Sequence, residues 1–467
     1  MRTLSVVLLF WSYLAFAALR VPRKLDEFLQ VPQIVKDDHS AVYVSRYLDH
    51  PELAQNLTRI HNLFGDQFAY SGYITTQPSL GSNLFYLFFE ARNGNKKAPV
   101  LLWLQGGPGG SSLFGCFSEV GPFELTGDPA MPSPRKLSWG NNYAMLFIDN
   151  PVMTGFSYTE HEEGYSHTEA QVADNLYKAL QQFFTIHPEY QKNEFYLTGE
   201  SYAGKYIPAL GARIDAENRR GGLPFINLKG LAIGDGLVDP ITQIGAYADV
   251  LGSFGMAGDA EVTAIAAVQQ RCQAAIAQAQ WREAGDCFAD LINGPPDLIQ
   301  NITHTNNYYD LRTTNEPSYG PDEGQFANRS DVRAALHVGS HYFQESAIPY
   351  LALYSDMMQS EVTDLVLLLT AGYKVALYNG QYDLIVAPAT TAGMLSSLPW
   401  VGTTSFLQQP MRIWKVDPAD GEIAGYVRSF KNLQYIVVRD AGHILPFNQP
   451  RRALDLITRF VENKPFF

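Results

Sequence analysis

Cysteine is scarce in this sequence: only Cys116, Cys272 and Cys287 occur among 467 residues. A fold stabilised by several disulfides is therefore excluded, because such folds need many more cysteines for their length. The cysteines and the ten histidines also form no pair or cluster at metal-ligand spacing. Since structural and catalytic metal sites need such groups of ligands, we expect neither a metal nor any other cofactor.

Positive charge is also in short supply: 34 Lys and Arg stand against 47 Asp and Glu, which gives a net charge of -13. A surface of this sign repels phosphates, so nucleic acid and anionic membranes are not expected as main partners. It suits an acidic compartment, where carboxylates partly protonate. Beyond the N-terminus, the apolar stretch 362–380 is interrupted by Asp364, Gly372 and Lys374. We therefore expect no stable membrane association.

The N-terminus contains an apolar run from Leu4 to Leu19, directly after Met1 and Arg2. At about 16 residues this run is short for a membrane-spanning helix. The sequence Ala15-Phe16-Ala17 matches the A-x-A pattern of a signal-peptide cleavage site. We predict that residues 1–18 are a cleaved signal peptide and that the chain enters the secretory pathway, to be secreted or to reach the lysosome. An uncleaved membrane anchor is the alternative.

Passage through the secretory pathway makes three sequons candidates for glycosylation and two cysteines candidates for a disulfide. Asn56, Asn301 and Asn328 each begin an Asn-x-Ser/Thr sequence and become candidate glycosylation sites. An oxidising lumen favours a disulfide between Cys272 and Cys287, which closes a short loop at low entropic cost. Cys116 is then left over, and we expect it to be a buried free thiol.

Short apolar runs alternate with helix-like stretches over most of the chain. Seven runs have the length of strands and are continuously apolar, as in strands covered on both faces: 84–92, 99–106, 144–151, 194–201, 228–236, 374–383 and 433–443. Residues 168–188 show instead the spacing of an amphipathic helix. This alternation predicts an α/β fold with a mostly parallel central sheet and helices on both faces.

The alternation stops between residues 238 and 350. This part contains an Ala- and Gln-rich helical stretch (260–281), the Cys272–Cys287 pair and a Tyr-rich loop, but no strand pattern. We predict an inserted cap at 238–350 that lies over the carboxyl edge of the sheet, where substrates enter such folds. The core then consists of two parts, residues 19–237 and residues 351–467.

A serine lies at the corner between a predicted strand and a predicted helix. The pentapeptide Gly199-Glu200-Ser201-Tyr202-Ala203 is similar to a G-x-S-x-G nucleophile elbow, with Ala203 in place of the second glycine. Small residues allow a tight turn that lifts the Ser201 hydroxyl above the sheet, at a helix N-terminus that favours developing negative charge. The alternative is an ordinary helix N-cap.

A nucleophilic serine needs a base and an orienting carboxylate, which in folds of this kind follow it in the order Asp, His. Asp383 ends the apolar run 374–383, and His443 ends the run 433–443. Because the carboxyl ends of parallel strands meet at one edge of a sheet, both side chains would lie near Ser201. Either residue alone would fit a turn or a cap. Together, in this order, they predict a Ser201–Asp383–His443 triad.

A Gly-rich turn, LQGGPGGSS (104–112), follows another predicted strand. Its backbone can approach a substrate closely because glycine has no side chain. Peptide N–H groups in such a position can stabilise an oxyanion, and we predict that Gly107 and Tyr202 supply the two donors. A plain Gly/Pro turn is the alternative interpretation.

Taken together, these motifs resemble those of serine carboxypeptidases, and most closely the vitellogenic carboxypeptidase-like branch of that family. The matching stretches are spread over nearly the whole mature chain: SGYI (71–74), WLQGGPGGSSLFGCFSEVGPF (103–123), FIDNPVMTGFSY (147–158), LTGESYAGKYIPAL (197–210), LAIGDGLVDP (231–240), DVRAALHVG (331–339), YNGQYDLIV (378–386) and DAGHILPFNQP (440–450). The resemblance implies an α/β-hydrolase fold with an inserted cap. Ser201, Asp383 and His443 fall on the family's triad positions.

The resemblance also implies how the substrate's C-terminal carboxylate is bound. Gln105, Gly106, Glu119 and Glu200 stand at the family's carboxylate-binding positions. Two close, partly buried Glu side chains raise each other's proton affinity, and a protonated acid can donate a hydrogen bond to a carboxylate. Read singly, each Glu would be an ordinary surface or capping residue. Gln105 replaces the family's more usual Asn, and Gly110 stands where many members have Cys.

The implied activity is that of a serine-type carboxypeptidase, which releases C-terminal residues through an acyl-enzyme and is favoured at acidic pH. Its substrate would be a peptide or protein with a free C-terminus. Acyltransferases and hydroxynitrile lyases of the same fold are alternative enzyme classes, because the triad motifs do not separate them. A non-catalytic hydrolase-fold binding protein is a further alternative, against which the complete set of triad residues argues.

Overall fold

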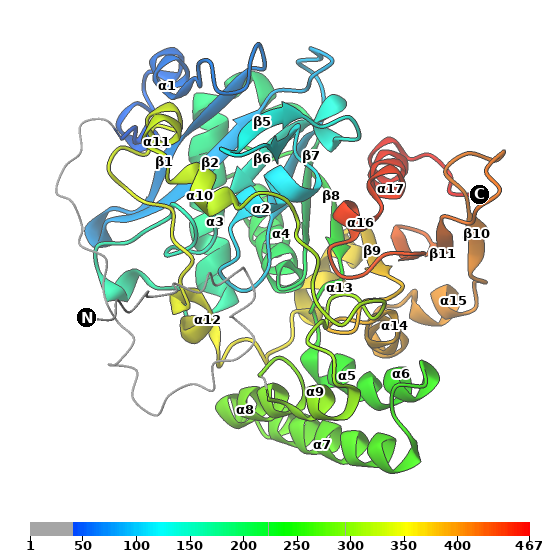
Figure 1. Cartoon of the computed structure of the whole chain (residues 1–467). Coiled ribbons are helices and arrows are strands. Elements are labelled where there is room, and N and C mark those ends of the chain that lie inside the picture. Colours follow the sequence, from blue (N-terminus) through cyan, green and yellow to red (C-terminus); the bar gives the residue numbers. More distant parts are fainter. Residues whose placement is uncertain (1–40, 223, 295) are drawn as a thin grey trace, which may run out of the picture.

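A ten-stranded sheet forms the centre of the molecule (Figure 1). The computed structural model describes residues 41–222, 224–294 and 296–467, so the expected signal peptide lies outside the described residues. The strand order is β1-β2-β6-β3-β7-β8-β9-β12-β11-β10. All neighbouring pairs from β6 to β12 are parallel. The outer strands β1, β2, β11 and β10 pair antiparallel.

All seven strands expected from the sequence are present in this sheet. Its strands are β1 (Ala69–Gln77), β2 (Ser82–Phe89), β3 (Val100–Leu104), β6 (Ala144–Ile148), β7 (Phe195–Glu200), β8 (Leu228–Gly234), β9 (Lys374–Gly380), β10 (Arg412–Trp414), β11 (Gly425–Phe430) and β12 (Leu433–Val438). A separate two-stranded sheet consists of β4 (Phe123–Thr126) and β5 (Met131–Pro134). The strands β1, β4, β5, β10 and β11 were not expected.

Helices cover both faces of the sheet. The helices of the core are α1 (Pro51–Thr58), α2 (Ser112–Phe114), α3 (Glu169–Ile186), α4 (Ala203–Arg220), α13 (Val362–Ala371), α14 (Pro388–Ser397), α15 (Thr403–Leu407), α16 (Leu445–Asn448) and α17 (Pro450–Glu462). The expected helix 168–188 is α3. None of the helices in the described ranges is long and apolar enough to cross a membrane.

Burial on both faces explains why the central strands are continuously apolar. In β3, Val100 and Leu102 belong to one core cluster, together with residues of α3, α4 and α13. Leu101 and Trp103 belong to a second cluster, together with residues of α17. Successive side chains of a strand point to opposite faces, so a strand that is buried on both sides needs an apolar residue at each position. The expected α/β class is thereby confirmed.

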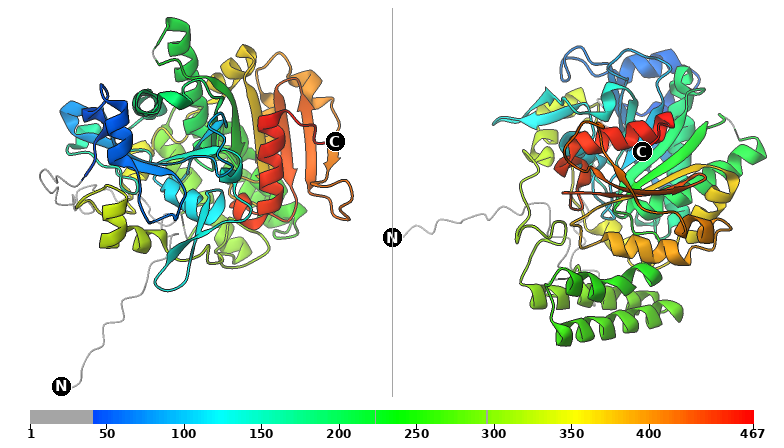
Figure 2. Two further views of the ribbon diagram at one scale, coloured as in Figure 1. Left: turned by 90° about the horizontal axis from the view of Figure 1, so that it is seen from above. Right: turned by 90° about the vertical axis from the view of Figure 1, so that its right-hand side faces the viewer.

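The segment 238–350 divides into two parts. The helices α5 (Pro240–Gln243), α6 (Tyr247–Ser253), α7 (Asp259–Ala277), α8 (Trp281–Leu291) and α9 (Leu298–Thr303) lie below the sheet in Figure 1 and form a separate layer in the right-hand view of Figure 2. The helices α10 (Glu323–Ala327) and α11 (Ser330–Ala335) pack instead against the second core cluster, and α12 (Ile348–Leu353) ends the segment. No strand forms within 238–294 or 296–350.

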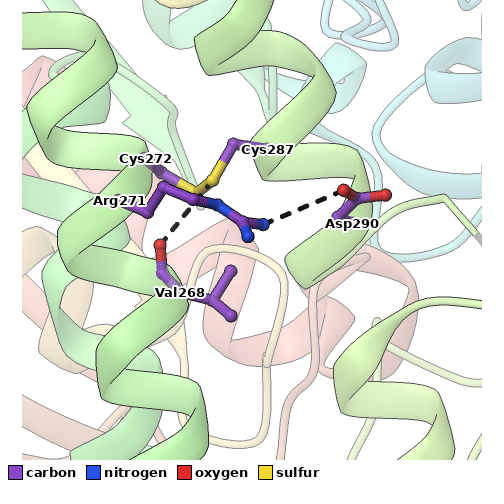
Figure 3. Close-up of a disulfide and its surroundings, with 5 residues drawn as sticks. All are labelled: Val268, Arg271, Cys272, Cys287 and Asp290. Atoms are coloured by element: carbon purple, nitrogen blue, oxygen red, sulfur yellow. Dashed lines mark hydrogen bonds and ion pairs between the residues drawn. A yellow bond between two sulfur atoms is a disulfide. The ribbon is translucent and has the colours of Figure 1, made fainter.

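A disulfide joins the two long helices of this helical layer (Figure 3). Cys272 on α7 and Cys287 on α8 form the bond, with their Cα atoms 5.4 Å apart. Arg271 and Asp290 form an ion pair between the same two helices, with an N···O distance of 3.8 Å. The remaining cysteine, Cys116, is buried and free.

Candidate active site

Four neighbouring parallel strands each end with a polar residue at the same edge of the sheet. Ser201 follows β7, Asp235 follows β8, Asp383 follows β9 and His443 follows β12. Adjacent strands lie about 4.8 Å apart, so the topology alone brings these side chains near one another. The helical layer is inserted between β8 and β9, at this same edge.

Ser201 occupies a turn in which the backbone adopts a conformation rare for a residue with a side chain. Its φ is 61°, in the left-handed region that is costly for residues other than glycine. A Cβ atom at Gly199 would lie 2.2 Å from the carbonyl oxygen of Leu104, which explains the small residue there. The N-cap of α4 is Tyr202 and not Ser201. The turn thus has the geometry of a nucleophile elbow and not that of a serine N-cap.

His443 and Asp383 form a buried hydrogen-bonded pair. Nδ1 of His443 lies 2.9 Å from Oδ2 of Asp383. The ring of Tyr309 stacks on the imidazole, with the ring centroids 4.7 Å apart. Nε2 of His443 has no hydrogen-bond partner among the described residues, and both His443 and Ser201 line one cavity. With Nδ1–H donating to the carboxylate, Nε2 is the nitrogen that can accept a proton.

A second acid, Asp235, lies beside the His443–Asp383 pair and was not singled out from the sequence. A carboxyl oxygen of Asp235, one of Asp383 and a ring nitrogen of His443 all lie within 4.8 Å of one another. Oδ1 of Asp235 accepts a hydrogen bond from the Gly380 amide at 2.8 Å. Burial and the charge of Asp383 raise the pKa of Asp235 well above its ordinary range. The Asp235 carboxyl group therefore favours its protonated form.

The Gly-rich turn between β3 and α2 approaches Ser201 closely. A Cβ atom at Gly106 would lie 2.6 Å from the amide nitrogen of Tyr202 and 2.6 Å from Cβ of Ser201. Gly107 has a φ of 114°, which glycine adopts readily. Within the described part of the chain, neither Gly107 nor Tyr202 donates its N–H to a backbone carbonyl. Both N–H groups are therefore available to a substrate oxygen.

Gln105, Glu119 and Glu200 form a buried polar cluster beside this turn. Nε2 of Gln105 donates to Oε1 of Glu200 at 2.7 Å, and Oε1 of Gln105 accepts from Nε1 of Trp103 at 2.8 Å. Burial raises the pKa of both Glu119 and Glu200, and the neighbouring Glu119 raises that of Glu200 further. A Cβ atom at Gly115 would lie 2.8 Å from Oε1 of Gln105, so the glycine leaves room for the longer amide side chain.

A loop of the segment 238–350, residues 305–319, reaches His443 and the cavity that it lines. It contributes Tyr309, Glu316 and Tyr319 to the cavity lining. The amide of His443 donates to the Tyr309 carbonyl at 2.6 Å. A Cβ atom at Gly442 would lie 2.2 Å from that carbonyl oxygen, which explains the small residue before the histidine. The sequence showed a Tyr-rich loop here, but no local pattern places it against a histidine more than a hundred residues away.

The three sequons differ in their surroundings. Asn56 on α1 and Asn301 on α9 are exposed. Asn328 is half-buried: its Oδ1 accepts from the Phe343 amide at 2.8 Å, and its Nδ2 donates to the Phe343 carbonyl at 3.1 Å. A glycan is attached at Nδ2, so a structural hydrogen bond already engages the atom that would be modified at Asn328.

The sequence matches known proteins over most of its length. A family model described as serine carboxypeptidase matches residues 64–463. Probable serine carboxypeptidase CPVL of Dictyostelium discoideum is 47% identical over 401 residues, which covers 86% of this chain and 80% of that protein. Vitellogenic carboxypeptidase of Aedes aegypti is 38% identical over 419 residues, covering 88% and 87%. The chain therefore belongs to the serine carboxypeptidase family and is a hydrolase, as its motifs indicated.

The fold matches a solved member of the same class. Kex1(delta)p of Saccharomyces cerevisiae, described as a prohormone-processing carboxypeptidase, aligns with a TM-score of 0.76 at 24% identity. The alignment covers 88% of this chain and 96% of that one. At this level of identity the match is evidence about the fold alone. It confirms the expected α/β-hydrolase architecture.

Proposed function

We propose that this serine carboxypeptidase uses Ser201 as nucleophile, His443 as general base and Asp383 as the carboxylate that orients the imidazole. One observation carries the assignment. Nδ1 of His443 is bound to Asp383 at 2.9 Å, while Nε2 is left without a partner among the described residues, in a cavity that Ser201 also lines. This is the arrangement that a serine needs to lose its proton to an imidazole.

The reaction proceeds in two halves through an ester. Oγ of Ser201 attacks the last peptide carbonyl while its proton moves to Nε2 of His443. That proton then passes to the departing amino group, and the C-terminal residue leaves. Water attacks the resulting ester, again giving its proton to Nε2. Nε2 returns the proton to Oγ of Ser201 as the ester bond breaks, and the shortened peptide is released. The N–H groups of Gly107 and Tyr202 stabilise the oxyanion in both halves.

Exopeptidase selectivity comes from the recognition of the substrate's terminal carboxylate. Gln105, Gly106, Glu119 and Glu200 form this binding site. No Lys or Arg is among the residues that border the cavity in the described part of the chain. A carboxylate is therefore held by hydrogen bonds from neutral donors, including a protonated Glu, and not by an ion pair. The raised pKa values of Glu119 and Glu200 supply this protonated form in mild acid.

The same proposal extends to the organisation of the chain and to its compartment. Residues 1–18 are removed as a signal peptide, and the mature protein is secreted or lysosomal. Residues 238–350 form a cap between the core parts 19–237 and 351–467, and the loop 305–319 of this cap borders the catalytic cavity. Asn56 and Asn301, whose side chains are exposed, carry glycans.

The test is mass spectrometry of a peptide library after incubation with the protein, from acid to neutral pH. We expect stepwise loss of single C-terminal residues with the wild type and none with Ser201→Ala, while both proteins melt at the same temperature. Internal cleavage, or activity retained by Ser201→Ala, would contradict the assignment. Transfer of the acyl group to an added alcohol in preference to water would identify an acyltransferase instead.

A further inference from the structure

The catalytic cavity has an acidic and aromatic lining beside the triad. This lining includes Phe114, Tyr309, Tyr319 and the carboxyl group of Glu316. No basic side chain of the described residues other than His443 borders the same cavity. Aromatic faces attract cations through their quadrupoles, and a carboxylate attracts them through its charge. Such a combination suits a positively charged ligand group.

One carboxyl oxygen of the half-buried Glu316 lacks a hydrogen-bond partner. Its Oε2 atom is buried and forms no hydrogen bond with any described residue. Burial raises the pKa of Glu316 to about 8. A hydrogen bond with Tyr319 acts in the opposite direction on this pKa. A carboxyl oxygen that is buried without a hydrogen-bond partner is still costly, because it gives up its hydration. Groups of this kind concentrate at functional sites, where a ligand supplies the missing interaction.

Glu316 is electrostatically connected to the carboxylate-binding pair. Burial and then the charge of Glu316 raise the pKa of both Tyr309 and Tyr319. The charges of Glu200 and Glu119 also act on Tyr319, so this ring lies near both groups of acids. The substrate residue whose carboxylate is held by Glu119 and Glu200 is the C-terminal one. Its side chain is therefore the part of the substrate nearest to Glu316.

A buried asparagine holds the loop that presents Glu316. Asn307 is fully buried, and its Nδ2 donates to Oγ1 of Thr313 at 2.8 Å and to the carbonyl of Asn315 at 3.3 Å. Its Oδ1 accepts from the Tyr309 amide at 3.0 Å. Both ends of the segment between Tyr309 and Glu316 are thus fixed to one side chain. A recognition group needs this kind of support to keep its geometry.

From this arrangement we propose that Glu316 determines specificity by pairing with the cationic side chain of a C-terminal lysine or arginine. Phe114 and Tyr319, whose rings are in edge-to-face contact with centroids 5.5 Å apart, line the cavity beside it and pack against the aliphatic part of that side chain. The inference rests on the proposed function, since it names the substrate class that the same site accepts.

Ionisation of Glu316 is coupled to the binding of such a substrate. The titratable groups that share the cavity with Glu316 are Tyr309, Tyr319, Tyr350, Glu200, Glu345 and His443. Only His443 can carry a positive charge, and it must be neutral to act as the base. A bound guanidinium or ammonium group supplies the missing positive charge and favours release of the Glu316 proton. The preference for a cation should therefore increase as the pH rises from acid towards neutrality.

The test compares two peptides that differ only in the C-terminal residue, arginine or citrulline. Citrulline has nearly the shape of arginine but no charge. We expect the wild type to favour arginine by about tenfold or more in kcat/KM, because hydrogen bonds between charged groups are the strong ones. In Glu316→Gln the ratio should fall close to one at every pH, because the arginine side chain loses its charged partner. Glu345→Gln, which changes another glutamate of the cavity, should keep the wild-type ratio.

The outcomes separate this inference from the function on which it rests. A wild-type ratio near one, or a ratio unchanged in Glu316→Gln, would overturn the role of Glu316 while leaving the carboxypeptidase intact. A preference for arginine only at the residue before the C-terminus would overturn the assignment to the C-terminal side chain. If neither peptide lost its last residue, the proposed function itself would fail, and this inference with it.

Discussion

Amidation of the substrate's C-terminus perturbs the interaction that the Glu119–Glu200 pair is proposed to make. A free carboxylate offers only acceptors, and the site offers donors: a protonated Glu and the N–H of Gly106. An amide replaces one acceptor oxygen by an NH₂ group, which faces a donor and leaves it unpaired. A buried unpaired donor costs about 1–3 kcal/mol. We therefore expect kcat/KM to fall by a factor of about 5 to about 150 for the amidated peptide.

The loss of kcat/KM on amidation should depend on pH. This dependence separates the titration of the Glu119–Glu200 pair from that of His443. Burial raises the pKa of Glu119 and of Glu200, so the pair keeps a proton in mild acid and loses it as the pH rises. Peptide hydrolysis should then decline on the alkaline side. Hydrolysis of a neutral ester, which needs no protonated Glu, should persist. Combining Glu119→Gln with Glu200→Gln should remove the decline for peptides, because an amide donates at every pH.

The assay is kcat/KM against pH for three matched substrates: the free peptide, its C-terminal amide and a neutral ester. The Glu119→Gln, Glu200→Gln double variant is measured in parallel. Equal values for the free and the amidated peptide would mean that the carboxylate site is misassigned. Coincident pH profiles for the peptide and the ester in the wild type would refute the protonated pair.

Two further predictions concern other buried acids. Burial raises the pKa of Asp149 from 3.8 to about 6, so its contribution of about 3 kcal/mol to the free energy of unfolding is present in acid and is lost as the pH rises through about 6. Urea unfolding should show a smaller change with pH in Asp149→Asn, and parallel profiles would refute this. Asp235→Asn should keep kcat, because its amide can donate to Asp383, whereas Asp235→Leu should lower kcat by about tenfold or more with little change in KM. Equal losses in both variants would contradict this role.

The central strands could be predicted, and so could the position of Ser201, Asp383 and His443 at one edge of the sheet, because the signals that specify them are local. A strand buried on both faces is apolar at every position, as Val100 to Leu104 are. The edge strand β10 lacks this signal, because its residues Arg412 and Ile413 are exposed. The carboxyl ends of parallel strands also lie at one edge of the sheet. The order of Ser201, Asp383 and His443 in the sequence was therefore enough to place them together.

Asp235 and Glu316 could not be identified in the same way. Asp235 belongs to a stretch that matches the family. Its role, however, depends on the position of Asp383, which follows the neighbouring strand β9 and comes only after the segment 238–350 in the chain. Glu316 lies in a loop without regular periodicity. Its place beside Tyr309 and Tyr319 follows from how the segment 238–350 packs against the loop of His443. Both roles depend on long-range contacts, which leave no pattern in nearby residues.

Stoichiometric labelling by a fluorophosphonate tests the central claim, the identity of the nucleophile, most directly. The protein is titrated with the reagent, its carboxypeptidase activity is followed, and the modified peptide is identified by mass spectrometry. The account predicts a single adduct per chain, on Ser201, with loss of activity in proportion to labelling and no adduct on Ser201→Ala. An adduct on another residue that abolishes activity, or activity that persists after Ser201 is fully modified, would contradict the account.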